Sequence, residues 1–122
     1  MKISNKVTEP LGRLIAGDTG SAPYLSGPKL VSFYNECGFD DVYGEGFPSR
    51  WRYSTDKIVA SNGTPMLKKI LEDFIDPRRF NGDEKLVDTV ASEINQLIKY
   101  DGFALIKNGD IYKVANTNGS FI

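Results

Sequence analysis

Two neighbouring segments of the sequence carry apolar stripes at helical spacing, and these constrain the fold most strongly. The segments 65–76 and 84–100 repeat apolar residues at i, i+3 and i+4, which is typical of amphipathic helices. The stripes consist of Met66, Leu67, Ile70, Leu71, Phe74 and Ile75, and of Leu86, Val87, Val90, Ala91, Ile94, Leu97 and Ile98. Pro77 is expected to end the first helix near Asp76, and Asp83 to cap the second. The short connector between them predicts an antiparallel helix pair.

Three shorter helices are predicted before this pair. The first covers Asn5–Ala16, where Pro10 indicates either a later start or a kink. The second is capped by Ser26 and stops at Gly38, a residue suited to the left-handed conformation that follows a helix. The third is expected to begin with Ser54 as its cap, because serine is a favoured residue at helix starts.

The last organised segment, FALIKNGDIYKV, predicts a β-hairpin with its turn at Asn108-Gly109. A lone hairpin is marginal in water, so it must pack on the helices. The sequence therefore predicts a mostly helical α+β fold of four or five helices, with a C-terminal β-hairpin packed on the helical core. We expect one domain over residues 1–122, with an ordered core at about 5–115 and a tail or the start of a linker at 116–122.

The composition excludes several kinds of chemistry. Histidine is absent and Cys37 is the only cysteine, so the chain has no intrachain disulfide, no Cys/His zinc site and no triad that uses imidazole. Cys37 itself is expected to be a buried small apolar residue. We therefore expect a protein that is not an enzyme and that carries no cofactor.

The charge and hydropathy of the chain also bear on its location and partners. A formal net charge of −1 is not that of a protein that coats nucleic acid through its overall field. There is no apolar run near 18 residues, and the N-terminus lacks the apolar middle of a signal peptide. We expect a cytoplasmic protein with no membrane contact.

The segment GFDDVYGEGFPSRWRY, residues 38–53, differs from the helical segments around it. Its carboxylates Asp40, Asp41 and Glu45 could hold a divalent cation in a nuclease-like site, but they do not match a calcium-binding loop. The preferred interpretation is a solvated acidic loop without metal. We expect an irregular connector, anchored on the core by its aromatic residues Phe47, Trp51 and Tyr53.

A second candidate surface is basic. It consists of Arg50, Trp51, Arg52, Lys68, Lys69, Arg78 and Arg79. Arginine beside an aromatic ring suits a stacked base or a phosphate, so these residues could bind nucleic acid or a protein partner. The simpler alternative is that Arg50 and Arg52 pair with the acids of the preceding loop. The helix before the hairpin offers only Lys85 and Lys99 as cations. This argues against a winged-helix protein that reads DNA through that helix.

The chain resembles the small N-terminal domains of bacterial abortive-infection proteins of the AbiJ type. The similarity spans Leu11 to Val114 and is carried by SGPKLVSFYNECGFDDVYGEGFPSRWRYSTDKI, SNGTPMLKKILEDFIDPRRF and LIKYDGFALIKNGDIYKV. The resemblance implies a non-enzymatic sensor or adaptor domain in antiviral defence, linked to an effector such as a HEPN-type ribonuclease. The HEPN catalytic motif contains histidine, so that effector is not in these residues. The pattern brings no catalytic residue to this chain.

The sequence favours two functions over the third, a metal-dependent nuclease. The first is a sensor or adaptor domain that binds a trigger or protein partner and couples it to an effector. The alternative is a winged-helix-like regulator that binds nucleic acid through the basic residues.

Overall fold

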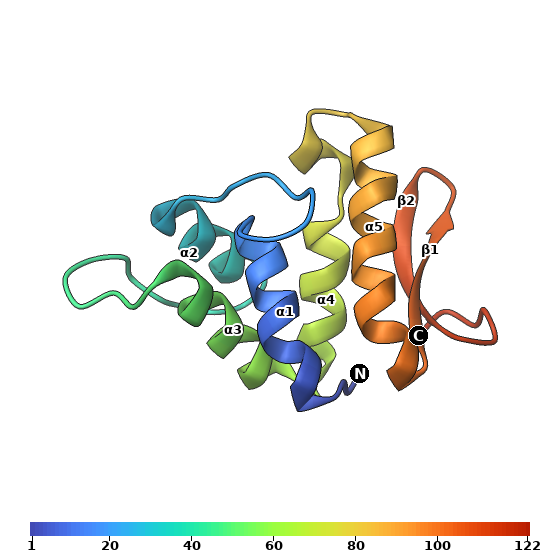
Figure 1. Ribbon diagram of the computed structural model, residues 1–122, viewed down its shortest axis with the longest axis horizontal. Helices are drawn as coiled ribbons and strands as arrows, with labels where there is room; N and C mark the ends of the chain where they lie inside the picture. The colour runs from blue at the N-terminus through green and yellow to red at the C-terminus, as the bar shows by residue number, and fades with distance from the viewer.

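The apolar stripes fold into helices that enclose one core (Figure 1). The structure, a computed structural model, describes residues 1–122. Its α-helices are α1 (Asn5–Ala16), α2 (Gly27–Glu36), α3 (Arg50–Ser61), α4 (Pro65–Phe74) and α5 (Glu84–Ile98). The short 3-10 helices are η1 (Pro77–Phe80) and η2 (Lys99–Asp101), and the strands are β1 (Phe103–Asn108) and β2 (Ile111–Asn116). The predicted mostly helical α+β fold with a C-terminal hairpin packed on the helices is confirmed.

Side chains at the helix starts accept hydrogen bonds from backbone N–H groups that no helical carbonyl reaches. Ser26 and Asp83 do so at the starts of α2 and α5, as predicted. The predicted helix over Asn5–Ala16 is confirmed, and it continues through Pro10 without the later start that this proline could have caused. The apolar face of α1, which is buried, holds the helix together despite the one hydrogen bond that proline cannot make.

The start of α3 is the main error in the predicted helices. α3 begins at Arg50, with Ser49 before it, and not at a cap formed by Ser54. Ser54 is fully buried, and its hydroxyl donates to the Gly12 carbonyl oxygen at 2.6 Å. The hydroxyls of Ser54 and Tyr34 lie 2.8 Å apart, and Tyr34 must be the donor because Ser54 has a single proton. Ser54 therefore bonds to neighbouring helices and cannot cap its own.

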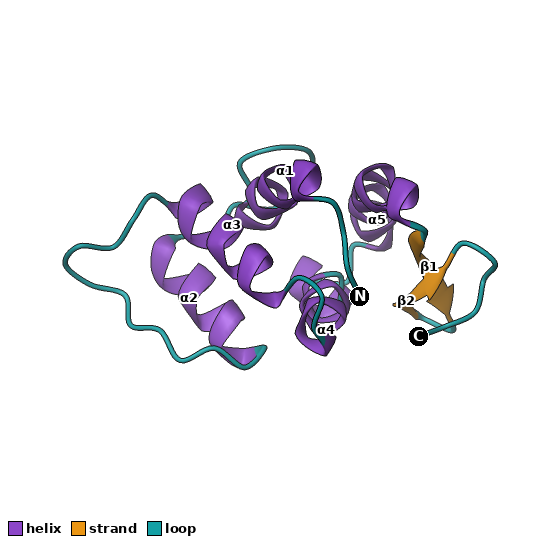
Figure 2. Ribbon diagram, turned by 90° about the horizontal axis from the view of Figure 1, so that it is seen from below, coloured by secondary structure: helices purple, strands orange, loops and turns teal.

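α1 and α3 lie side by side (Figure 2), and Gly12 is the residue of α1 that is in tightest contact with Thr55 of α3. A Cβ atom at Gly12 would lie 2.6 Å from Thr55 Oγ1 and 2.7 Å from the Thr55 backbone. The same contact leaves the buried Thr55 hydroxyl without a hydrogen-bond partner. Only glycine allows this spacing of the two helices, so Gly12 is a packing residue in a helix interior, where glycine is otherwise unfavourable.

Aromatic rings join α2, α4 and η1 within the core. Phe33 packs edge-to-face on Tyr34 and Phe74, and Phe74 packs in the same way on Phe80.

Cys37 is buried as predicted, and its thiol lies 3.6 Å from an oxygen of Asp73. Burial, followed by the nearby Asp73 carboxylate, raises the pKa of the Cys37 thiol to about 12. The thiol is therefore protonated at neutral pH and is a poor nucleophile.

The hairpin has a different turn from the predicted one. Asn108 pairs with Ile111 across the strands, so the two turn residues are Gly109 and Asp110, not Asn108 and Gly109. Gly109 has φ 70°, and no positive φ occurs at Asp110. This is the pattern of a turn with glycine at its first central position.

Two side chains from the helices occupy the outer edges of the hairpin. The central pair is Leu105 and Val114, whose backbone polar groups point away from the partner strand. The Asn95 side chain on α5 accepts from Leu105 N at 2.7 Å and donates to Leu105 O at 3.0 Å. On the other edge, Glu72 of α4 accepts from Val114 N at 2.9 Å. Glu72 thus holds β2 on α4.

The segment after β2 turns back on the strand. Ser120 O accepts from Asn116 N at 2.9 Å, and Phe121 forms an antiparallel bridge with Ala115. At the opposite end of the chain, Ile3 is buried and is bonded through its backbone to the Asn62 side chain. Residues before and after the predicted ordered core, in sequence, thus also pack on the rest of the protein.

Replacing Gly12 by alanine tests the α1–α3 contact. The added methyl group meets the Thr55 backbone, which cannot yield without moving α3. Overpacking costs about 1–3 kcal/mol, which exceeds the roughly 1 kcal/mol that alanine gains in a helix. We expect Gly12→Ala to lower the free energy of unfolding measured in urea. The control is Gly44→Ala, since a Cβ there meets nothing within 4 Å; a gain in stability at Gly12 would contradict the contact.

Replacing Asn95 by alanine tests the edge contact of the hairpin. The change leaves the N–H and C=O of Leu105, a buried residue, without partners, at a cost of about 1–3 kcal/mol. We expect faster hydrogen exchange at the Leu105 amide and a lower free energy of unfolding. Gln96→Ala is the matched control, because Gln96 is exposed and bonds only to Lys99. Equal effects of the two changes would remove the proposed role of Asn95.

Candidate functional site

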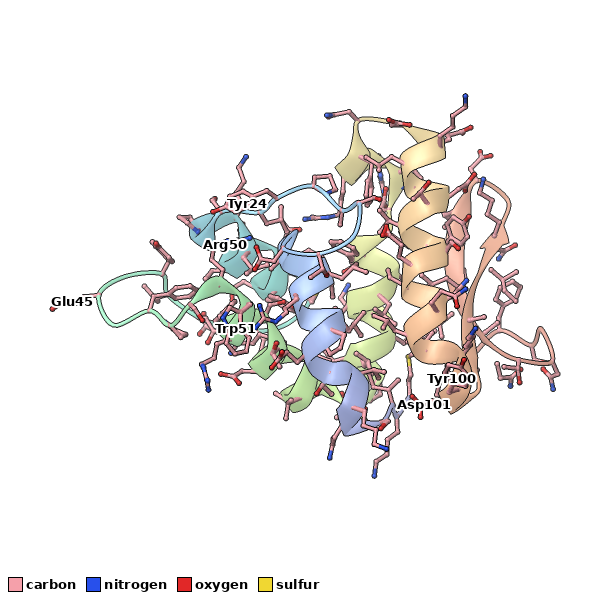
Figure 3. All side chains as sticks on the ribbon, viewed as in Figure 1. Tyr24, Glu45, Arg50, Trp51, Tyr100 and Asp101 are labelled. Carbon is pink, nitrogen blue, oxygen red and sulfur yellow. The ribbon has the colours of Figure 1, made fainter.

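Residues 39–49, between α2 and α3, form a loop that projects from the helical body; we call it the arm (Figure 1). In Figure 2 the arm lies at one end of the molecule and the hairpin at the other. Glu45 lies at the tip of the arm, and its side chain points away from the body (Figure 3). The arm contains three carboxylates and no basic residue. It is therefore the acidic extremity of the protein.

Contacts with α2 and between its own aromatic rings hold the arm in place. The Asn35 side chain donates to the Asp41 carbonyl and accepts from the Asp41 backbone N–H, both at 2.9 Å. Tyr43 packs on Gly27, where any Cβ would meet its ring. The ring centroids of Tyr43 and Phe47 are 4.6 Å apart. The arm is thus tied through both its backbone and its aromatic rings.

The Asp41 carboxylate lies between two groups of α3. It pairs with Lys57 Nζ at 2.7 Å and accepts from the Tyr53 hydroxyl at 2.8 Å. The Lys57 bond and then the Tyr53 bond hold the pKa of Asp41 below its usual value of 3.8. Burial, followed by the Asp41 bond, raises the pKa of Tyr53. Lys57 Nζ also lies 4.7 Å from the centre of the Phe39 ring and 5.0 Å from that of Tyr53, within cation–π range.

A groove of about 340 Å³ separates the arm from the first turns of α3. Its lining residues are Asp41, Val42, Glu45, Gly46, Phe47, Pro48, Tyr53, Asp56 and Lys57. Val42 is 88% exposed and Tyr43 is 49% exposed. Sequence reasoning missed Val42, Asp56 and Lys57 as site residues. The i, i+4 spacing of Tyr53 and Lys57 could have indicated that they share a helix face, had α3 been predicted from Arg50.

The acidic residues do not form a metal centre. The structure has no group of three or more acidic, histidine or cysteine side chains that could hold an ion. Asp41 is bound to Lys57 and Tyr53, whereas Glu45 projects from the tip. The alternative of a carboxylate-metal nuclease built on Asp40, Asp41 and Glu45 therefore has no geometric support.

Arg50 is bound within the protein and does not pair with the acids of the arm. Its guanidinium donates to the carbonyl oxygens of Ala16 and Leu25, and pairs with Asp18 at 2.7 Å. It also lies 3.9 Å from the centre of the Tyr24 ring. Arg50 thus closes the loop between α1 and α2, and the predicted pairing with the acids of the arm is wrong.

Trp51 lies on the surface of α3 and is not part of the core, contrary to the prediction. The Arg13 guanidinium lies 4.0 Å from the centre of a Trp51 ring, and that of Arg52 lies 5.1 Å away. Arg52 is exposed and forms no ion pair, whereas Arg13 pairs with Glu9. Phe47 and Tyr53, whose ring centroids are 4.9 Å apart, are the aromatic anchors of this region.

The other four basic residues of the predicted surface lie on α4 and η1, away from the first turn of α3 (Figure 1). Three of them pair with neighbouring acids: Lys68 with Glu72, Lys69 with Asp73, and Arg78 with Asp76. The fourth, Arg79, lies 4.4 Å from the centre of the Phe33 ring. Acidic partners are thus interleaved with these cations, which form a mixed surface.

No protein-family model matches this sequence, and searches of curated proteins and of solved structures find no similar protein. No helix has both the length and the apolar character needed to span a bilayer.

The pH dependence of stability tests the Asp41 contacts. Because the folded pKa of Asp41 is lowered, its stabilising effect is complete above its usual pKa of 3.8 and is lost as the pH falls through the lower folded value. We expect Asp41→Asn to cost up to roughly 1 kcal/mol at pH 7, and the difference from the unmodified protein to vanish well below pH 3.8 in urea titrations. Asp40→Asn is the control, since Asp40 is exposed and forms no ion pair. A difference that persists in acid would contradict the assignment.

Proposed function

We propose that this chain is a non-enzymatic sensor or adaptor domain that binds a protein partner through the arm. The observation that carries the proposal is Val42, an apolar side chain that is 88% exposed on an anchored loop. Single exposed apolar residues are common, but Val42 adjoins the half-exposed Tyr43 and the apolar side chains of the groove. Together they form an apolar surface with an acidic rim, which suits a protein interface.

Charge favours a protein over nucleic acid as the partner of the arm. Asp40 and Glu45 form no ion pair, and the arm has no basic residue to neutralise them. A phosphate chain would be repelled by this rim, whereas a basic protein surface would be attracted to it.

The resemblance to AbiJ-type N-terminal domains supplies the class of partner. It implies bacterial antiviral defence and an effector, a HEPN-type ribonuclease, whose activity the domain controls. In this proposal the arm binds either that effector or the protein trigger.

Nucleic-acid binding is the second candidate function, and one observation favours it. The half-buried Trp51 of α3 lies beside Arg13 of α1 and the exposed, unpaired Arg52, an arrangement that could stack a base. Arg50 no longer belongs to this hypothesis, because its guanidinium is bound to Ala16, Leu25 and Asp18.

Site-specific photo-crosslinking in bacterial cells during phage infection distinguishes the two functions. A photoreactive phenylalanine derivative is placed at Val42, at Arg52 or at the exposed Lys85 of α5, which is the control. We expect a discrete protein adduct from the Val42 position alone.

Binding of that purified partner should fall at least about ten-fold in Val42→Asp, because burying a charge in an apolar contact costs more than 1.4 kcal/mol.

Other outcomes contradict the proposal. A nucleic-acid adduct at Arg52 with none at Val42 would favour the second function. Equal adducts at Val42 and Lys85, or unchanged affinity in Val42→Asp, would show that the arm is not the binding surface.

A further inference from the structure

The groove between the arm and α3 has the size and walls of a site for one long side chain. Its volume of about 340 Å³ is at the lower end of the range for ligand pockets, about 300–1,000 Å³. Val42, Phe47 and Pro48 contribute apolar surface to it. Such a wall suits the aliphatic stem of a long side chain, which packs on apolar surface while its charged head stays near polar groups.

The charge of the groove determines which kind of charged head group it can bind. Asp41, Glu45 and Asp56 line it together with a single cation, Lys57. The charge of Lys57 is already paired with Asp41 at 2.7 Å. Asp56 and Glu45 form no ion pair, so the groove and its rim keep a net negative charge. A cation is therefore stabilised here, and an anion is repelled.

Lys57 shows that this wall already holds a cation. Its ammonium lies against the Asp41 carboxylate and within 5.0 Å of the centres of the Phe39 and Tyr53 rings. A carboxylate beside aromatic faces is an arrangement that binds ammonium and guanidinium groups. The intramolecular lysine occupies one side of the site, and the groove beside it remains open to solvent.

We propose that the groove takes an arginine or lysine side chain from the partner protein, with Asp56 attracting its charge beside the groove, Glu45 adding negative charge at the tip of the arm, and Val42, Phe47 and Pro48 packing on its stem. This inference rests on the proposed function, since the side chain belongs to the protein that binds the arm. It adds a chemical requirement: the segment of the partner that enters the groove is basic.

Nuclear magnetic resonance titration of the purified chain tests the groove without the partner. The probe is N-acetyl-arginine amide, and the matched control is N-acetyl-citrulline amide, which has nearly the same shape and no charge. We expect the arginine probe to shift the backbone amides of Val42, Gly46, Phe47 and Asp56 saturably at millimolar concentration. The citrulline probe should bind at least several-fold more weakly.

Variants of the protein distinguish the contribution of charge to probe binding from that of shape. The double change Glu45→Gln, Asp56→Asn should weaken binding of the arginine probe by about two- to five-fold, the range for exposed ion pairs. Glu84→Gln, an exposed change on α5, should leave it unaltered. The spectrum of each variant also reports whether it is folded.

The outcomes distinguish this inference from the adaptor function. Absent shifts, equal shifts with citrulline, or binding unaffected by the double change would overturn the basic-side-chain site. If a partner still crosslinks at Val42 in that case, the adaptor function stands. Binding of the arginine probe without any partner at Val42 would support the site and overturn the adaptor function.

Discussion

The close contact of α1 and α3 at Gly12 is the constraint on which the remaining structure depends. Ser54 bonds to the Gly12 carbonyl from the interior of α3, which has an extra helical turn before it. That extra turn brings Arg50 to the carbonyls of Ala16 and Leu25. It also places Tyr53 beside the arm. A packing requirement between two helices thus decides where a loop and a candidate binding surface lie.

The charges of the protein fall into two groups with different consequences. Most of the basic residues singled out from the sequence are bound to acids, carbonyls or rings of the same chain, as Arg50 and Lys69 illustrate. At the arm the opposite holds, because Asp40 and Glu45 have no partner. A net charge of −1 conceals this division. The surface available to a partner is therefore more acidic than the composition indicates.

Periodicity was sufficient to predict α1, α2, α4 and α5, because each has one buried apolar face and a cap or breaker at its ends. It failed at α3, whose first turn, RWRY, is charged and aromatic and whose buried serine resembles a cap. The pairing of Arg50 with Asp18, and that of Glu72 with β2, join residues distant in sequence. No local pattern contains such contacts. The interior Gly12 was the one available signal of the close helix contact.

The two ends of the molecule differ in how far their polar groups are bonded, and their apolar side chains covered, within the chain itself. At the hairpin the backbone edges are occupied by Asn95 and Glu72, and the most exposed apolar residue of the two strands, Ile111, remains more than half covered. At the arm, Val42 is almost fully exposed although Asn35 and Lys57 hold the loop in place. Anchoring of this kind lowers the entropy that binding must remove, because the contact surface is ordered beforehand. An ordered and uncovered surface is what a partner can bind with the least loss of freedom, and in this structure that surface is the arm.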